Sequence, residues 1–333
     1  MQRTEETGPE VIAPPSPQPK DSTPVIGQMV HQATGIASPD RRFSLWPPPL
    51  WTLALVCFSA GVILNFLGQS ILGWFFIALF LLLALVMGNI KTQGLRWIYE
   101  PLRHADYDEA LGRADRLLQW FPRISLFHDL RGSTLRYAGR LAEAEQAFRT
   151  SIEMGQIRPG LAQALHLENL AEVLLDLGRF DDATAVFEAS IRIFPRNSGA
   201  GNGLAEVCLR RGRDSRRALL LVDNALQLKQ SNLRTRNLDR HNLANMWANR
   251  AQALAMLGQK DEASSAIVTA GEVGDPEFIP GLAGTYWRCG VAFRLMDQEQ
   301  SALEQFQKAI EIDPHGLYGQ FAAAAMQEQP AHH

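Results

Sequence analysis

The chain has 333 residues, and 32 lysines and arginines against 35 aspartates and glutamates give it a net charge of −3. This near-balance excludes a general polyelectrolyte attraction to nucleic acid. Three cysteines, Cys57, Cys208 and Cys289, lie far apart in the sequence, which excludes a disulfide scaffold or a cysteine-based zinc module as the basis of the fold.

The N-terminal segment, residues 1–46, is rich in proline and predicts a disordered tail. Ten of the 18 prolines fall within the first 49 residues. Proline fixes φ and lacks an N–H, so this segment cannot propagate a helix or a sheet. A proline-docking ligand is the alternative interpretation. We expect no signal peptide, because the apolar run begins only near residue 50.

An apolar block follows, in which residues 43–90 carry no charge. As a single helix, residues 50–88 would be about 58 Å long, nearly twice the ~30 Å hydrocarbon core of a bilayer. The polar break Gly68–Ser70 divides the block. The pattern therefore predicts a transmembrane hairpin of helices 50–67 and 71–89. The alternatives are a buried hairpin in a soluble core, a re-entrant loop, and one tilted span with an interfacial helix.

The flanks of this block predict its orientation. Arg41 and Arg42 precede it, whereas Lys91, Arg96 and Arg103 follow it. Aromatic residues typical of the membrane interface lie near the ends of both helices: Trp46, Trp51, Trp74, Trp97 and Tyr99. Because positive residues stay on the cytoplasmic side, we expect an integral membrane protein with two spans, whose tail and C-terminal region are cytoplasmic.

Residues 91–333 show a helical period and a repeated motif. The pattern A-x3-F-x7-P occurs at Ala183-Phe187-Pro195 and again at Ala302-Phe306-Pro314. The corresponding alanines recur every 34–45 residues, at Ala110, Ala144, Ala183, Ala218, Ala263 and Ala302. A glycine turn separates the two halves of most units, as at Gly139, Gly178, Gly212 and Gly258.

This pattern resembles the tetratricopeptide repeat family over residues 91–316, as about five repeats and a half-unit. The resemblance implies an all-α solenoid of helix-turn-helix units. Each unit leaves an apolar face that only its neighbour can cover. The alanine-rich segment 317–329 is expected to form the capping helix that such arrays need. The 45-residue spacing before Ala263 requires an insertion, which we expect at residues 230–239.

In this family the first helix of each unit lines a concave groove that binds protein or peptide partners. Residues four apart share a helix face, which gives these candidate groove residues: Asp129, Ser133, Arg136, Glu168, Glu172, Asp176, Asn202, Glu206, Arg210, Asn245, Asn249, Gln252, Trp287, Arg288 and Arg294. Glu168, Glu172 and Asp176 form an acidic ridge, which favours a partner with basic residues. The alternative is a solvated face, and neutralising the ridge is expected to leave folding intact.

The sequence offers no catalytic, cofactor-binding or metal-binding motif. No H-E-x-x-H pattern occurs, and the glycine-rich stretch Gly199–Gly203 follows no strand, so it indicates an inter-repeat turn rather than a phosphate loop. We therefore expect a non-enzymatic, membrane-anchored scaffold that binds a protein or peptide, with the bilayer contacted by residues 50–89 and with no cofactor, small-molecule substrate or nucleic acid. The alternatives are an extracytoplasmic assembly or export factor and an enzyme without a recognisable motif.

Overall fold

The computed structural model describes residues 48–68, 70–155, 160–231 and 240–328, and all the regular elements in these ranges are α-helices. They are α2 (Pro48–Phe66), α3 (Ser70–Arg103), α4 (Tyr107–Trp120), α5 (Ser125–Tyr137), α6 (Leu141–Gly155), α7 (Leu161–Asp176), α8 (Phe180–Ile193), α9 (Ser198–Arg210), α10 (Ser215–Ser231), α11 (Arg240–Met256), α12 (Lys260–Val273), α13 (Ile279–Leu295), α14 (Glu299–Ile312) and α15 (Leu317–Gln327). The expected disordered tail, residues 1–46, lies outside the described residues, as does most of the expected insertion at 230–239.

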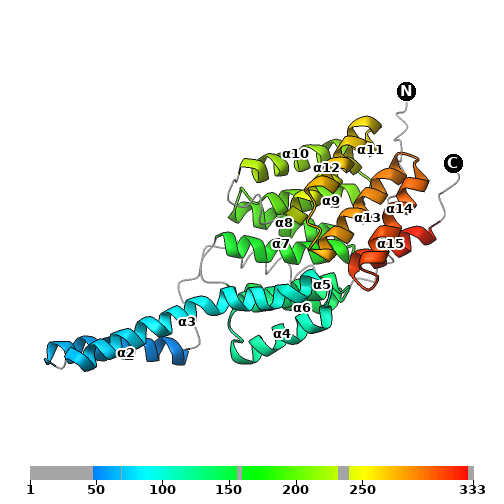
Figure 1. The fold of residues 1–333 in the computed structure, drawn as a ribbon. Coiled ribbons are helices and arrows are strands. Elements are labelled where there is room, and N and C mark those ends of the chain that lie inside the picture. The colour runs from blue at the N-terminus through cyan, green and yellow to red at the C-terminus, as the bar shows by residue number, and fades with distance from the viewer. Residues whose placement is uncertain (1–47, 69, 156–159, 232–239, 329–333) are drawn as a thin grey trace.

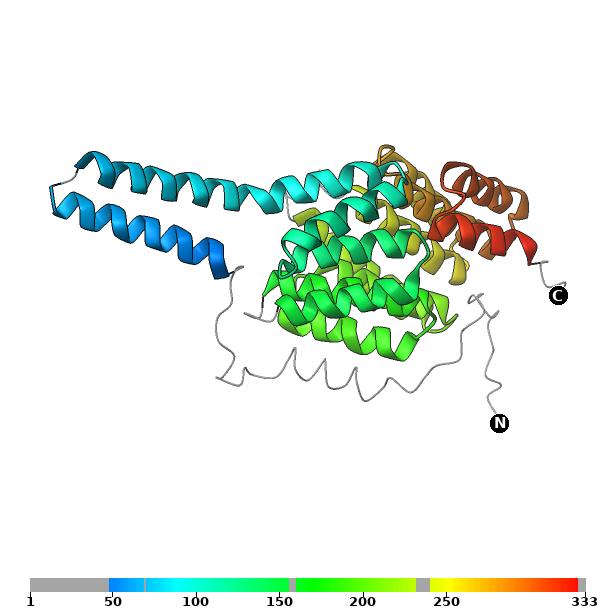
Figure 2. The same ribbon diagram turned by 90° about the horizontal axis from the view of Figure 1, so that it is seen from below.

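Helices α2 and α3 form an antiparallel hairpin that projects from the body of the molecule (Figure 2). Gly68, with φ of 78°, lies in the turn between them. The helices approach closely at Gly61, where an added Cβ would lie 2.9 Å from the carbonyl oxygen of Gly73. The rings of Phe58 and Phe80 also pack across the hairpin, with centroids 5.1 Å apart. Small residues at the crossing thus allow the two backbones to meet.

The second helix of the hairpin does not end at residue 89, as the sequence predicted, but continues to Arg103. The end of the uncharged block is not a helix stop, because the chain beyond it buries Ile98 and Leu102 against the repeats. In the part of the chain that the structure describes, no helix combines the length and the hydropathy of a membrane span. The expected transmembrane hairpin of residues 50–67 and 71–89 is therefore not supported.

The remaining helices form the predicted all-helical solenoid (Figure 1). Helix α4 packs beside the end of α3, and the pairs α5/α6, α7/α8, α9/α10, α11/α12 and α13/α14 follow, with α15 against the last pair. The glycines predicted in the turns, Gly139, Gly178, Gly212 and Gly258, have φ between 62° and 77°. Glycine adopts this left-handed conformation without steric cost. In the last pair Asp297 takes the same conformation, with φ of 64°.

The repeated phenylalanines fill the space between helices. Phe148, Phe187 and Phe306 are all at most 1% exposed. Each ring lies against a glycine: an added Cβ on Gly203 would lie 2.2 Å from Phe187, and one on Gly290 would lie 2.5 Å from Phe306. Because Gly203 belongs to α9 and Phe187 to α8, this contact joins one repeat to the next.

The superhelix turns tightly enough for its last helices to touch its first ones. Helix α13 contacts α3, and α15 contacts α5 (Figure 1). The Tyr107 hydroxyl donates to Asp313 Oδ2 over 2.6 Å, and Arg103 forms an ion pair with Glu277. The Phe278 ring stacks on Tyr99, with centroids 5.4 Å apart. These contacts close the solenoid on itself and enclose its inner face.

Candidate functional site

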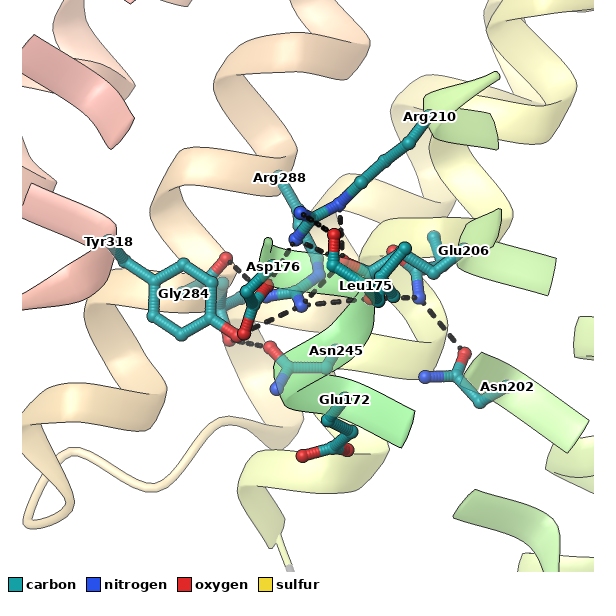
Figure 3. Close-up of polar contacts among 12 residues, drawn as sticks. Glu172, Leu175, Asp176, Asn202, Glu206, Arg210, Asn245, Gly284, Arg288 and Tyr318 are labelled. Carbon is teal, nitrogen blue, oxygen red and sulfur yellow. Dashed lines mark hydrogen bonds and ion pairs between the residues drawn. The ribbon is translucent and has the colours of Figure 1, made fainter. Parts of the chain in front are cut away.

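The inner face of the solenoid is formed by the first helix of each pair, as the repeat pattern predicted. Helix α7 contributes Glu172 and Asp176, α9 contributes Glu206 and Arg210, and α13 contributes Arg288. The side chains of Asp176, Glu206, Arg210 and Arg288 converge although they come from different repeats, whereas Glu172 lies apart from them (Figure 3). The structure therefore brings the central candidate groove residues together.

A chain of alternating charges runs through this inner face. Arg136 Nε donates to Asp176 Oδ2 over 2.6 Å, and Arg210 Nη2 donates to Asp176 Oδ1 over 2.9 Å. Arg210 Nη2 also donates to Glu206 Oε1 over 2.7 Å, and Arg288 Nη2 donates to Glu206 Oε2 over 2.9 Å. Asp176 is 1% exposed and Glu206 6%. Two carboxylates thus bridge three arginines away from bulk water.

The last helix closes this network from the C-terminal side. The Tyr318 hydroxyl of α15 accepts from Arg136 Nη2 over 3.0 Å and from Arg288 Nη2 over 3.2 Å. The Arg288 guanidinium also lies 4.9 Å from the centre of the Tyr318 ring, and that of Arg210 lies 5.1 Å from the centre of the Trp287 ring. Aromatic rings therefore cover the same two arginines that the carboxylates bind.

The two glutamates of the network have opposite protonation preferences. Burial alone would raise the pKa of Glu206, but the charges of Arg288 and Arg210 outweigh it and lower the pKa to about 2. Burial raises the pKa of Glu172, against the charge of Arg136, and the neighbouring Asp176 and Glu206 carboxylates add to the rise. Glu206 is therefore a fully compensated carboxylate, whereas Glu172 is an incompletely compensated one.

Polar side chains around the network form shorter links between repeats. Asn249 Nδ2 donates to Asn202 Oδ1 over 3.1 Å and to Glu206 Oε2 over 3.4 Å, and Gln252 Nε2 donates to the Arg288 carbonyl over 3.1 Å. The Thr285 hydroxyl donates to Asn245 Oδ1 over 3.1 Å. These amides fix the spacing of the helices that carry the charges.

Asp129 belongs to a separate cluster. Its Oδ1 lies 2.9 Å from His166 Nδ1, and its Oδ2 accepts from Asn169 over 2.9 Å. Arg294 does not reach the inner network, because its guanidinium binds Glu299 and the Ala325 carbonyl. Two of the predicted groove residues therefore serve other contacts between helices.

A cavity of about 200 Å³ adjoins the network. It is lined by Ser133, Tyr137, Glu168, Glu172, Asn242 and Phe278, among others. Carboxylates and aromatic rings face this space together with Arg136, whose Nη1 donates to Glu172 Oε2 over 2.5 Å. A further cationic group could bind the carboxylates and the ring faces beside Arg136. Within the described residues, no three His, Cys, Asp or Glu side chains lie close enough to hold a metal ion.

The acidic ridge of α7 differs from its sequence-based description. Its members share one face, but Arg136 and Arg210 already neutralise Asp176, and Glu168 is 7% exposed. Only Glu172 keeps a substantial exposed fraction, 29% of its side chain. Since Asp176 is a buried counter-ion, its neutralisation should destabilise the fold, contrary to the expectation from sequence.

Sequence reasoning did not identify Tyr318, because it lies in the expected cap and outside the repeating register. It also passed over Phe278 and Tyr107, which close the ends of the superhelix. The presence of Tyr318 in the alanine-rich segment 317–329 is the signal that could have indicated a contact of this segment with the inner face.

Comparisons with known proteins agree with the fold. Two family models described as tetratricopeptide repeat match residues 122–196 and 168–232. Among curated proteins, no sequence matches the chain significantly.

Solved structures with a similar arrangement have low sequence identity. The hetero-tetramer Cut9–Hcn1 of the APC/C matches with 15% identity and a TM-score of 0.47, over 91% of this chain and 53% of that one, so the match spans only about half of that protein's length. The thermophilic protein TTC0263 of Thermus thermophilus matches with 22% identity and a TM-score of 0.43, over 61% of this chain and 100% of that one.

YrrB, whose structure is described as a TPR protein with an unusual peptide-binding site, matches with 19% identity and a TM-score of 0.32, over 65% of this chain and 98% of that one. With TM-scores below 0.5, these structures carry no argument about this chain. The family models identify the repeats of residues 122–232 as tetratricopeptide repeats, and the helix pairs α11/α12 and α13/α14 continue the same arrangement.

Proposed function

We propose that the protein is a membrane-anchored scaffold, in which the α2/α3 hairpin holds the repeat solenoid at a bilayer and the solenoid binds a protein or peptide. The observation that carries this proposal is the hairpin's surface. Its described side chains include large apolar groups that face outwards: Val62, Ile63, Phe66, Leu67, Ile71, Trp74 and Phe75. An exposed apolar surface of this extent needs a partner, and the uncharged sequence 43–90 favours lipid.

The hairpin is joined to the solenoid without a flexible linker. Helix α3 passes from the turn at Gly68 to Arg103 as one element, and Gly94 packs against Phe127 of α5. The proposed anchor would therefore set the orientation of the solenoid as well as its location. A binding surface held near a membrane also gains effective concentration for partners in the same membrane.

The partner that fits the inner face best carries a basic side chain. Glu172 faces the cavity beside Tyr137, is partly exposed and has a raised pKa. A lysine or arginine entering this cavity would supply the positive charge that Arg136 alone does not. Helical repeats of this family bind protein or peptide partners, and the inner network of this chain leaves Glu172 as its accessible carboxylate.

Anchoring and orientation are tested on the full chain. We expect the protein to stay in the pellet when membranes are washed with alkaline carbonate. Reporter fusions at residues 46 and 333 should both report the cytoplasmic side, as the flanking basic residues predict. Release by carbonate would refute the anchor. Reporters on opposite sides would refute the hairpin, and both outside would favour the extracytoplasmic assembly factor.

Partner binding is tested by proximity labelling and co-purification from detergent-solubilised membranes. Glu172→Gln should lower recovery of the partner, and added salt should lower recovery by the unsubstituted protein. Glu188→Gln, at a half-exposed residue of α8 beside Arg192, is the matched control and should change nothing. Equal recovery with Glu172→Gln and with the control would refute a basic side chain at this cavity.

A further inference from the structure

We propose that the part of the solenoid next to the hairpin binds anionic lipid headgroups. This inference rests on the proposed membrane anchor and adds to it a specific lipid chemistry. The surface, called here the basic collar, consists of Lys91, Arg96, Arg116 and Arg123 with the tryptophans Trp97 and Trp120.

The length of α3 places the collar at headgroup depth. From Ser70 to Asn89 the helix has 20 residues, which at ~1.5 Å per residue span about 30 Å, the thickness of the hydrocarbon core. Lys91, Arg96 and Trp97 follow within about 12 Å along the same helix. Headgroups and interface add about 5–8 Å on each side of the core. The first basic residues after the apolar segment would therefore lie among the headgroups or directly beneath them.

Helix α4 completes the collar from the side. It runs antiparallel to α3, beside the part of α3 that joins the solenoid (Figure 1). The guanidinium groups of Arg113 and Arg116 lie 5.4 and 5.2 Å from the centre of the Trp97 ring, and Arg113 Nη1 donates to the Trp97 carbonyl over 2.9 Å. Trp120 lies one turn beyond Arg116, towards the hairpin, and is 79% exposed.

The charges of these two helices are separated along their length. Between residues 89 and 97 there is no acidic residue, and between 112 and 123 only Asp115 occurs, which pairs with Arg131 over 2.7 Å. The acidic residues Glu100, Asp106, Asp108 and Glu109 lie towards the other end of the helix pair. Glu109 pairs with Arg113 over 2.7 Å and with Arg116 over 3.3 Å, which leaves Arg96 and Arg123 without a carboxylate from this group. The end nearest the hairpin therefore carries an excess of positive charge, together with aromatic residues that favour the membrane interface.

Continuity with the apolar hairpin decides between lipid and protein as the occupant. A protein would need a groove or an apolar pocket, whereas the collar consists of long basic side chains that follow directly on the apolar hairpin along α3 or lie at the facing end of α4 and just after it. Each lysine or arginine near an anionic surface contributes about a fivefold gain in binding. The three arginines of the collar together would therefore favour binding to anionic over neutral lipid by about a hundredfold.

The full chain in lipid nanodiscs tests this inference, and incorporation into pure phosphatidylcholine discs reports the anchor separately. We expect adding phosphatidylglycerol to raise the melting midpoint of the solenoid, because a ligand that binds the folded state stabilises it. High salt should remove the increase. The triple variant Arg96→Gln, Arg116→Gln, Arg123→Gln should incorporate normally and lose the response.

The matched control changes three exposed arginines at the start of α10, as Arg213→Gln, Arg216→Gln and Arg217→Gln, and should keep the response. A response to phosphatidylglycerol that persists in the collar variant would overturn the proposal. So would its absence in the unsubstituted protein, which would favour a protein partner for this face. Failure to enter phosphatidylcholine discs would overturn the anchor and the collar together.

Discussion

Glu206 and Glu172 lie in opposite environments on the inner face, and we therefore expect substitution by glutamine to affect the stability of the fold differently at the two positions. Glu206 is held by Arg288 and Arg210, which lower its pKa from an ordinary value near 4.5 to about 2. One pKa unit corresponds to about 1.4 kcal/mol, so the folded state favours the charged form by about 3 kcal/mol. Glu206→Gln removes this charge and leaves Arg288 buried without an anionic partner, beside the Tyr318 hydroxyl and the Gly284 carbonyl.

Glu172→Gln is the matched comparison. Burial already raises the pKa of Glu172, and Arg136 keeps Asp176 as a partner when Glu172 is neutral. We expect Glu206→Gln to cost about 3 kcal/mol, which for a solenoid of this size lowers the melting midpoint by about 6–12 °C. Glu172→Gln should leave the midpoint nearly unchanged or raise it slightly.

Thermal unfolding of the full chain in detergent, followed by circular dichroism, measures the melting midpoint of both variants. The stabilisation by Glu206 is present above the unfolded pKa near 4.5 and is lost as the pH falls through about 2, because its folded-state pKa is lowered. The difference in melting midpoint between the unsubstituted protein and Glu206→Gln should therefore have its full size at pH 7 and become smaller below pH 4. Equal midpoints for the two glutamine variants at pH 7 would refute this account of the network.

Three further predictions concern packing and closure. Phe187→Ala should cost about 3–5 kcal/mol, because the ring is fully buried between two repeats, and an unchanged melting midpoint would contradict the stacking described. Gly203→Ala should lower the midpoint, since the new Cβ would overlap the Phe187 ring, whereas the control Gly112→Ala has open space and should raise it through a gain of about 0.5–1 kcal/mol. Tyr107→Phe should lower the free energy of unfolding by about 1–3 kcal/mol, because buried Asp313 loses its hydroxyl donor. Urea unfolding measures this loss. An unfolding curve equal to that of the unsubstituted protein would show that this contact does not couple the ends of the superhelix.

The repeats were predictable from the sequence because their determinants are local and recur. Each alanine, phenylalanine and turn glycine acts within one helix pair or between neighbours, so one motif describes every unit. Gly132 with Phe148 and Gly290 with Phe306 illustrate this, because in both pairs the glycine comes 16 residues before the ring that covers it.

The closed inner face was not predictable in the same way. Arg136 and Tyr318 are 182 residues apart, and their meeting depends on the sum of small rotations between successive pairs. No local pattern encodes this sum. The acidic ridge was recognised as a helix face, but its arginine partners lie on other repeats, so its neutralisation could not be seen. The helix end expected at residue 89 was wrong because the end of the uncharged block was taken for the end of the helix, whereas α3 continues to Arg103.

Closure of the superhelix restricts how the sequence of this chain can evolve. In an open array, a unit can be gained or lost at little cost, since each repeat contacts only its neighbours. Here the duplication or deletion of a single repeat would move Asp313 away from Tyr107 and Tyr318 away from Arg136. The copy number of the repeats is thus itself a determinant of the fold, and we expect related chains to vary in loop length far more readily than in the number of units.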